Sequence, residues 1–265
     1  MGRITLQESG RGTEVVDIYQ KFPTRIMLPL TGDDAVREAV FINAAGGIAG
    51  GDRLEFDVTA LGNALVTVTS QAAEKIYRAL DQRARVVTRL KACDAAKLAW
   101  LPQETIIFNS ARIDRQTEID LGAGVELMAL EWLVLGRAAH GEEVAHGEIR
   151  DRWLVRRDGR PVWADSFVLT EETFAHLRRR ALLSDCKAIG TLLYFGPDLD
   201  RRLELLRDVA QSLACHCAAT MVNGLIIVRL AAVTSSDLRS ALTCLLQHFR
   251  EGDASPFRVP KMWSC

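Results

Sequence analysis

Apolar and polar residues alternate along most of the first two thirds of the chain, a pattern typical of strands buried on one face. Residues 53–70 alternate on both sides of Gly62-Asn63, which predicts a hairpin with its turn at this pair. Turn signals recur about every 8 to 12 residues, as in a stacked or closed all-β body. Further strands are predicted at 85–92, 97–101, 105–108, 125–135 and 147–155.

Another hairpin is predicted around the pair Asp158-Gly159. Apolar residues alternate on both sides of the pair, at Trp153 and Val155 before it and at Val162 and Ala164 after it. Asp-Gly readily adopts the positive φ angles of a tight two-residue turn. We therefore expect residues 1–170 to be rich in strands.

The last third of the chain changes to the period of a helix. Apolar residues recur at three- and four-residue steps over 199–213, which predicts one helix. A second helix is predicted from an N-cap at Ser235 or Ser236 to Gly252. Between them, Asn223-Gly224 joins two apolar runs as a further hairpin. The expected C-terminal third is therefore mixed α/β with two helices.

Composition limits the domain organisation and the partners. The 265 residues are 48% hydrophobic and 25% charged, and no Pro-rich or Ser-rich linker interrupts them, which predicts one domain over 1–265, strand-rich in 1–170 and mixed α/β in 171–265. The formal net charge of −1 provides no positive field for nucleic acid or an anionic membrane. Residues 1–12 lack the apolar stretch of a secretory signal, and apolar runs fall short of the about 18 residues of a membrane span. We expect a cytoplasmic protein without nucleic-acid or membrane partners.

The cysteines do not form a recognisable framework. There are six, without a Cys-x-x-Cys pair, and we expect reduced and mostly buried thiols. Cys215-His216-Cys217 offers two thiolates on one face of an extended segment, where a structural zinc site needs four ligands. Packing at the junction between a helix and a strand is the favoured interpretation, and metal binding is the alternative.

A glycine-rich segment, Gly46 to Gly51, imitates the spacing of a phosphate-binding loop. Asp52-Arg53 follows where such a loop needs Lys and Ser or Thr, and the carboxylate would repel phosphate. Nucleotide binding is therefore not expected. Two interpretations stay open: a close connection between strands, or a backbone loop shaped for a protein partner or an ion path.

His140, Glu142 and His146 suggest a metal site, because imidazole and carboxylate suit nickel or zinc. On one strand the two histidines would lie about 20 Å apart, so only a turn at Gly141 or Gly147 could unite them. A metal-dependent hydrolase using these three residues is one alternative, and a solvated polar loop is the other. No Ser-His-Asp order, acid pair or nucleophile elbow stands out, and we do not expect an enzyme.

Seven segments spread over the chain form a joint pattern: NAAGGIAGGD at 43–52, SQAAEKIYR at 70–78, WLPQETI at 100–106, LGRAAHGE at 135–142, DRW with RRDGR at 151–160, GTLL at 190–193 and PKMW at 260–263. Together, in this order, they resemble the urease accessory protein UreD (UreH) family. Two features depart from the family's pattern: Ala44-Ala45 stands where prolines are common, and His140 where an apolar residue is usual.

This resemblance implies a mainly β fold, a β-helix-like stack of short strands with two helices in the C-terminal third. It also implies a non-enzymatic scaffold that binds the urease apoprotein and UreF, and UreG through UreF. Nickel would pass in transit to the urease active site, with no tightly bound cofactor. A generic protein-binding scaffold without a metal role is a third interpretation.

Four residues in the matching motifs are the predicted site. Asp52 and Glu142 are assigned to a transient nickel path, because carboxylate oxygens can hold a divalent ion weakly and exchange it. Gln71 and Glu104 are assigned to partner contact or passage. The alternative for each is a buried hydrogen-bonding residue that holds a turn.

Overall fold

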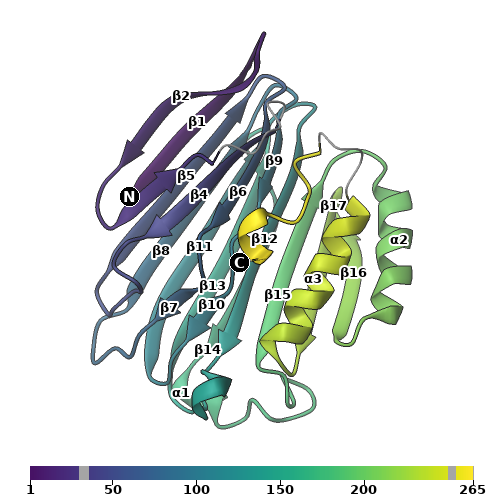
Figure 1. Ribbon diagram of the computed structural model, residues 1–265. Helices are drawn as coiled ribbons and strands as arrows, with labels where there is room; N and C mark the ends of the chain where they lie inside the picture. Colours follow the sequence, from purple (N-terminus) through teal and green to yellow (C-terminus); the bar gives the residue numbers. More distant parts are fainter. Residues whose placement is uncertain (30–35, 250–254, 265) are drawn as a thin grey trace.

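Two β-sheets face each other across a shared interior in this computed structural model, which describes residues 1–29, 36–249 and 255–264 (Figure 1). The first sheet has the order β14 (Arg160–Leu169), β13 (Gly147–Arg157), β11 (Ala111–Leu121), β8 (Ala84–Ala92), β5 (Arg53–Leu61), β1 (Gly2–Ser9) and β2 (Gly12–Gln20). The second has the order β16 (His216–Val222), β17 (Leu225–Ala232), β15 (Ala188–Phe195), β12 (Glu126–Leu135), β9 (Lys97–Trp100), β6 (Leu65–Ser70), β4 (Val36–Asn43) and β3 (Thr24–Met27). In this second sheet β10 (Thr105–Ile107) pairs with β12 and with β7 (Glu74–Ile76).

The chain passes back and forth between the sheets from β4 to β13. Strands of successive turns pair in parallel, as in β5 with β8, β8 with β11 and β11 with β13 in the first sheet. The pairs β4 with β6, β6 with β9 and β9 with β12 repeat the arrangement in the second. This is a β-solenoid-like stack, and the predicted mainly β fold is confirmed.

The hairpin predicted over residues 53–70 is wrong, although both of its strands exist. β5 pairs with β1 and β8 in the first sheet, and β6 pairs with β4 and β9 in the second. Gly62 and Asn63 adopt the expected positive φ angles of 50° and 49°, but their turn carries the chain from one sheet to the other. A strand buried on one face shows the same alternation in either arrangement, so the pattern could not distinguish them.

The other two predicted hairpins are confirmed. β13 and β14 pair antiparallel around Asp158-Gly159, and β16 and β17 pair antiparallel around Asn223-Gly224. All four turn residues have positive φ angles, between 49° and 77°, which Asn, Asp and Gly adopt most easily. Local turn chemistry therefore fixes both connections.

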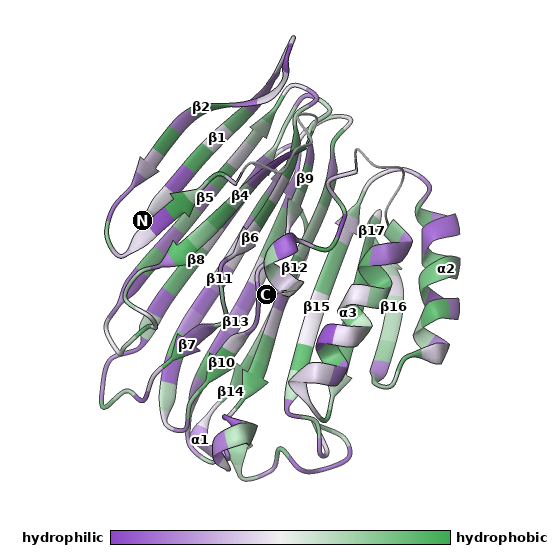
Figure 2. Ribbon diagram, viewed as in Figure 1, coloured by the Kyte–Doolittle hydropathy of each residue, from purple (hydrophilic) through white to green (hydrophobic). Residues whose placement is uncertain are grey.

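Both predicted helices are present and cover the outer face of the second sheet (Figures 1 and 2). They are α2 (Leu199–Ser212) and α3 (Ser235–Phe249), and their apolar faces pack with Trp132 and Tyr194. The proposed end of the second helix at Gly252 lies outside the described residues. A short α1 (Glu171–Phe174) and the 3-10 turns η1 (Ala138–His140) and η2 (Lys261–Ser264) were not predicted. None of the helices in the described part of the chain is long and apolar enough to span a membrane.

The interior between the sheets consists of two apolar layers. One contains Leu127 and Ala129 of β12, and the other contains Leu133 and Leu135 of the same strand. Glu131 lies between them on the inward face, with an exposed fraction of 6%. β11 and β13 show the same sequence of inward residues, with Arg115 and Asp151 at the corresponding place. A polar layer therefore separates the two apolar layers.

Candidate functional site

Arg115 is the centre of the polar layer. Its Nε and Nη2 atoms donate to the two carboxylate oxygens of Asp151 at 3.0 and 2.7 Å. Its Nη1 atom donates to Glu131 at 2.7 Å and to the Thr105 hydroxyl at 3.1 Å. The second oxygen of Glu131 accepts from the Trp100 indole N–H at 2.9 Å. The charged groups are thus bound to one another, as buried charges must be.

Strand register places these residues together. Arg115 and Asp151 are direct partners in the parallel pair of β11 and β13, so they project side by side from the first sheet. In the second sheet, Glu131, Thr191 and Arg229 are successive partners across β12, β15 and β17. Arg229 bonds Thr191 at 2.8 Å, and its guanidinium lies 2.7 Å from the carboxylate of Asp165. The polar layer therefore extends from the buried centre to the half-exposed Arg229.

Cavities lie along this layer. A cavity of about 430 Å³ is lined by Arg115, Glu131, Asp151 and Asp165, with apolar walls. A second, of about 60 Å³, shares Arg115 and Glu131 with the first and also contacts Glu74. The cavities form a row in which neighbours share lining side chains, and carboxylates line each of them.

A third cavity extends the row to the region of the predicted motifs. It has a volume of about 200 Å³ and shares Phe56, Ser70 and Glu74 with the second cavity. Gln71 and Asn43 also line it. The row of cavities thus extends from the 70–78 segment, one of the seven that carry the family resemblance, to the buried centre around Arg115.

Burial and charge act in opposite directions on these groups. Burial raises the pKa of Glu131, while Arg115 beside it acts to lower it. Burial alone would lower the pKa of Arg115, but Asp151 and Glu131 raise it above its ordinary value, so the guanidinium stays charged. Burial also raises the pKa of Glu74, although the Asn43 amide donates to it at 3.0 Å.

Asp52, the first predicted site residue, lies at the surface in its own turn. Its Oδ2 atom accepts the Ala49 backbone N–H at 2.8 Å, which is the turn-holding contact that the sequence left open. The adjacent glycines pack closely, and a Cβ on Gly47 would lie 2.4 Å from the ring of Tyr77. Close packing therefore explains at least one glycine of this loop, and the Tyr77 hydroxyl donates to the Gly46 carbonyl at 3.0 Å.

Glu142 is bound to Arg137, which lies against Phe108, the ring that contacts Tyr77. Its carboxylate accepts from Arg137 at 2.7 Å and from the Asn109 backbone N–H at 3.3 Å. The hydrogen bond from Arg137 keeps the pKa of Glu142 below its ordinary value. Arg137 stacks over Phe108, whose ring contacts Tyr77 edge-on. The glycine loop and the 135–142 segment, distant in sequence, are thus linked through two aromatic rings.

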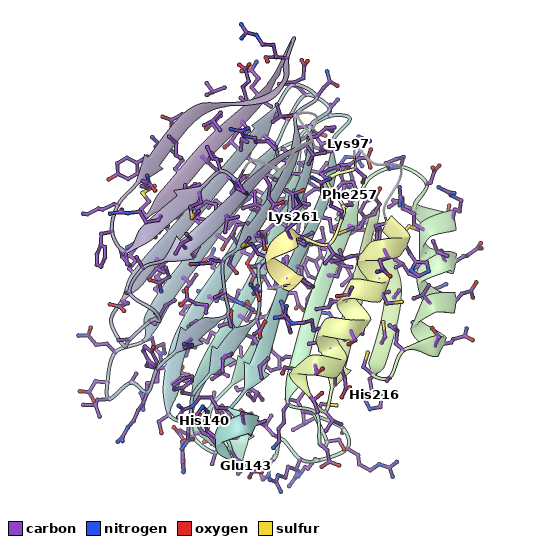
Figure 3. All side chains as sticks on the ribbon, viewed as in Figure 1. Lys97, His140, Glu143, His216, Phe257 and Lys261 are labelled. Atoms are coloured by element: carbon purple, nitrogen blue, oxygen red, sulfur yellow. The ribbon has the colours of Figure 1, made fainter. Side chains whose placement is uncertain are left out.

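The metal site suggested by His140, Glu142 and His146 does not form. His140 is exposed in η1, near the end of the molecule that carries α1 (Figure 3). His146 contacts Glu171 at 3.1 Å, and Glu142 is bound by Arg137. Across residues 1–29, 36–249 and 255–264, no three His, Cys, Asp or Glu side chains group so that they could hold a metal ion. The arrangement gives no support to a hydrolase using these residues.

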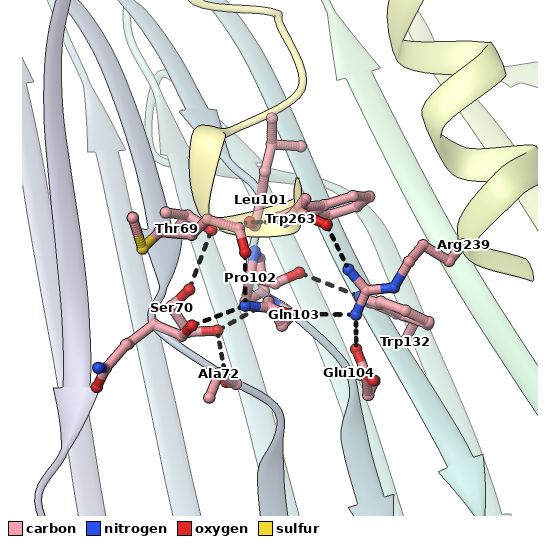
Figure 4. A network of polar contacts seen from close by, with 12 residues as sticks. Thr69, Ser70, Ala72, Leu101, Pro102, Gln103, Glu104, Trp132, Arg239 and Trp263 are labelled. Carbon is pink, nitrogen blue, oxygen red and sulfur yellow. Dashed lines mark hydrogen bonds and ion pairs between the residues drawn. The ribbon is translucent and has the colours of Figure 1, made fainter. Parts of the chain in front are cut away.

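Gln71 and Glu104 lie around Gln103, in a network that ties the 70–72 and 100–106 segments to the C-terminus (Figure 4). The Gln103 amide donates to the carbonyls of Gln71 at 2.8 Å and Met262 at 3.1 Å. Arg239 of α3 donates to Gln103 at 3.0 Å and binds the carboxylate of Glu104. The four predicted residues are therefore divided among separate places, and the structure does not bring them into one site.

Cys215-His216-Cys217 is a packing element at the start of β16. Both sulfur-bearing residues are half-buried against the core under the helices, while His216 is exposed. Burial raises the pKa of Cys217 to about 11, which opposes the thiolate that a metal would need. Cys186 is buried, whereas Cys93, Cys215, Cys217 and Cys244 are half-buried free thiols, so the expectation of mostly buried cysteines is wrong for the described residues. Cys265 lies outside them.

The central residues of the polar layer were missed. Glu131 was visible as a charge inside the apolar run 125–135, and a buried acid in such a strand signals a paired interior charge. Glu74 and Asp151 lie within the motifs that carry the family resemblance. Arg115 has a weaker signal, because it stands at an inward position of an alternating strand that was not predicted.

Replacing Glu74 by glutamine should not lower stability at pH 7. The folded state raises the pKa of this carboxyl by burial, so it disfavours the charged form, whereas glutamine keeps an oxygen for Asn43. We expect an equal or higher melting temperature for the variant at pH 7. The difference should vanish as the pH falls below the ordinary glutamate value of 4.5, where both states of the wild type are protonated. Thermal unfolding between pH 4 and 8 tests this, and a variant that melts lower at pH 7 would contradict it.

These features define a two-sheet, solenoid-like β protein with a helical cover and a charged interior layer. The chain belongs to the UreD urease accessory protein family, whose sequence profile matches residues 1–264. The predicted resemblance is confirmed.

Relatives match nearly the whole chain. It is 40% identical over 252 residues to the urease accessory protein UreD of Rhizobium johnstonii, covering 95% of this chain and 90% of that protein. The protein of the same name from Xanthobacter autotrophicus is 39% identical over 262 residues, with coverages of 99% and 88%. That from a Methylobacterium species is 37% identical over 270 aligned residues, with coverages of 99% and 94%.

Proposed function

We propose that this chain is a non-enzymatic scaffold for nickel delivery to urease in the cytoplasm. It binds the urease apoprotein and UreF, and it reaches UreG through UreF. Nickel is its cargo and passes through it without a tightly bound resting place. Membership of the UreD family supports a role in urease maturation.

The row of cavities between the sheets is the observation that favours passage through the chain. Glu74, Glu131, Asp151 and Asp165 line it, and three of the four acids are bound to guanidinium groups. Carboxylate oxygens are suitable ligands for a divalent ion, and their pairing with guanidinium groups keeps them from forming a closed cage, which suits transient binding.

The four residues predicted from the sequence remain part of this proposal. Asp52 and Glu142 are proposed for the outer part of a nickel path, and Gln71 and Glu104 for partner contact. Gln71 lines the third cavity, so it lies nearest to the proposed path. Glu104 is bound to Arg239, which joins it to the surface formed by α3.

The decisive experiment measures complex formation and nickel loading together. Urease subunits are co-expressed with UreF and UreG, with and without this chain, and complexes are isolated through a tag on UreF. We expect the chain to be recovered with urease and UreF, and the nickel content of urease to fall when the chain is omitted. Recovery of the complex with unchanged nickel on omission would favour the scaffold without a metal role.

Asp52→Ala should lower the nickel content of urease while leaving the fold mostly intact. The loss of one backbone contact at an exposed turn should cost roughly 1 kcal/mol. Melting, pull-down and urease nickel are measured on the same variant, with Asp120→Ala on the outer face of the first sheet as the control. Lost complex formation with a lower melting temperature would mean that Asp52 only holds its loop. Unchanged urease activation would exclude it from both roles.

A further inference from the structure

A cation of the protein itself, Arg115, lies between two cavities of the row. Arg115 and Glu131 are the side chains shared by the cavity of about 430 Å³ and the cavity of about 60 Å³. Both side chains are almost fully buried, with exposed fractions of 4% and 6%. A path between these two cavities therefore has to pass the Arg115–Glu131 pair.

Arg115 is bound unequally to its two acids. Asp151 receives two hydrogen bonds and stands beside it in the same sheet, as its register partner. Glu131 receives a single hydrogen bond, from Nη1, and the same Nη1 atom also donates to Thr105. The bond to Glu131 crosses from one sheet to the other. A small separation of the sheets would break the single contact first and leave the bidentate pair intact, because a bidentate pair fixes geometry more strongly.

The charge arrangement has a consequence for a divalent cation. An ion in either cavity faces a guanidinium that repels it and finds the Glu131 carboxylate already neutralised. When Arg115 leaves Glu131, a carboxylate oxygen becomes available at the junction of the two cavities. The same movement therefore weakens the repulsion at the junction, because the guanidinium stays paired with Asp151 in the first sheet, and it supplies a ligand.

Resting on the proposed function, we propose that Arg115 is a gate residue that closes the path between the two cavities by holding Glu131, and that nickel passes when this one contact opens. Arg115 is a positioning residue here, because it acts through Glu131 and does not itself bind the ion. Asp151 keeps the guanidinium anchored to the first sheet in both states. Trp100 holds the other oxygen of Glu131, so the freed carboxylate stays in place.

Arg115→Gln removes the fixed charge while keeping an amide that can donate to Asp151. We expect the full-length variant to bind one additional Ni²⁺ per chain, at least ten times more tightly than the wild type, in equilibrium dialysis. Arg115→Lys keeps the charge and should bind Ni²⁺ like the wild type. Arg115→Gln combined with Glu131→Gln should lose the gain, because the freed ligand is gone.

Several results would overturn the gate. These are equal Ni²⁺ binding by Arg115→Gln and the wild type, or a gain that survives Glu131→Gln. A variant that stays unfolded even with added Ni²⁺ counts equally against it, since the freed carboxylates should then be stabilised by the ion. The test is separate from that of the proposed function: urease nickel that does not depend on the wild-type chain would remove the nickel role, whereas binding to the isolated variants reports on Arg115.

Discussion

Trp263→Ala is expected to lower the free energy of unfolding by about 3 to 5 kcal/mol, the usual cost of truncating a buried tryptophan. Trp263 is 6% exposed and packs on Trp132, with ring centroids 5.9 Å apart. Its indole N–H donates to the Leu101 carbonyl at 3.2 Å, and Arg239 lies against both rings. The side chain therefore attaches the C-terminal segment to the outer face of the second sheet.

Chemical denaturation of the full-length variant measures this loss. Leu80→Ala is the control, because Leu80 is a large apolar side chain that is 77% exposed, and its removal should change stability by less than about 0.5 kcal/mol. The variant should also lose the order of the network around Gln103, since Met262 and the Trp263 carbonyl belong to it. A midpoint like that of the wild type would mean that the C-terminal segment is not held by this residue.

Asp151→Ala should have an effect of similar size, about 3 to 5 kcal/mol, for an electrostatic reason. Arg115 would lose both bonds of its bidentate pair and would remain buried with one acidic partner, Glu131, and the Thr105 hydroxyl. A buried guanidinium cannot lose its proton to escape this cost, so the penalty falls on the folded state. Equilibrium unfolding at pH 7 gives the difference directly.

Asp114→Ala is a control from β11, the strand that pairs with that of Asp151, where Asp114 directly precedes Arg115. Asp114 lies on the outer face of β11 and pairs with Arg152 at 2.7 Å, where the arginine side chain is 45% exposed. An exposed pair of this kind contributes at most about 1 kcal/mol. Similar losses of stability for Asp151→Ala and Asp114→Ala would show that the buried ion pair contributes no more than the exposed one. A small loss for both would show that Arg115 finds other partners.

The sequence predicts local structure well where turn chemistry and periodicity act over a few residues. Asp158-Gly159 and Asn223-Gly224 specify hairpins by their positive φ angles, and the leucine spacing specifies α2 and α3. The turn at Gly62-Asn63 has the same local signature, yet it links strands of different sheets. Which strands pair in the stack depends on residues one turn of the solenoid away, so a local sequence pattern does not determine it.

The candidate site was harder to predict than the fold. Asp52, Gln71, Glu104 and Glu142 were selected because they stand in motifs, and each is bound within its own neighbourhood. Among the charges of the polar layer, Glu131 stands inside an apolar run, whereas Arg115 and Asp151 stand at inward positions of alternating strands. Arg115, Glu131 and Asp151 come from three strands and become neighbours only when the register is known. Pairing between distant strands, and not residue type, makes them a site.

The polar layer also identifies the correct alignment of the parallel strands. Shifting one strand by two residues keeps every apolar side chain on the inward face, so alternation alone accepts the wrong alignment. In β11, β12 and β13 such a shift would move Arg115, Glu131 or Asp151 into an apolar layer and leave its partners unpaired. The cost of an unpaired buried charge excludes these alternatives. The charged centre thus specifies the register in which the strands stack. Replacing all three residues by neutral apolar ones would remove this specification of register even where it preserved stability.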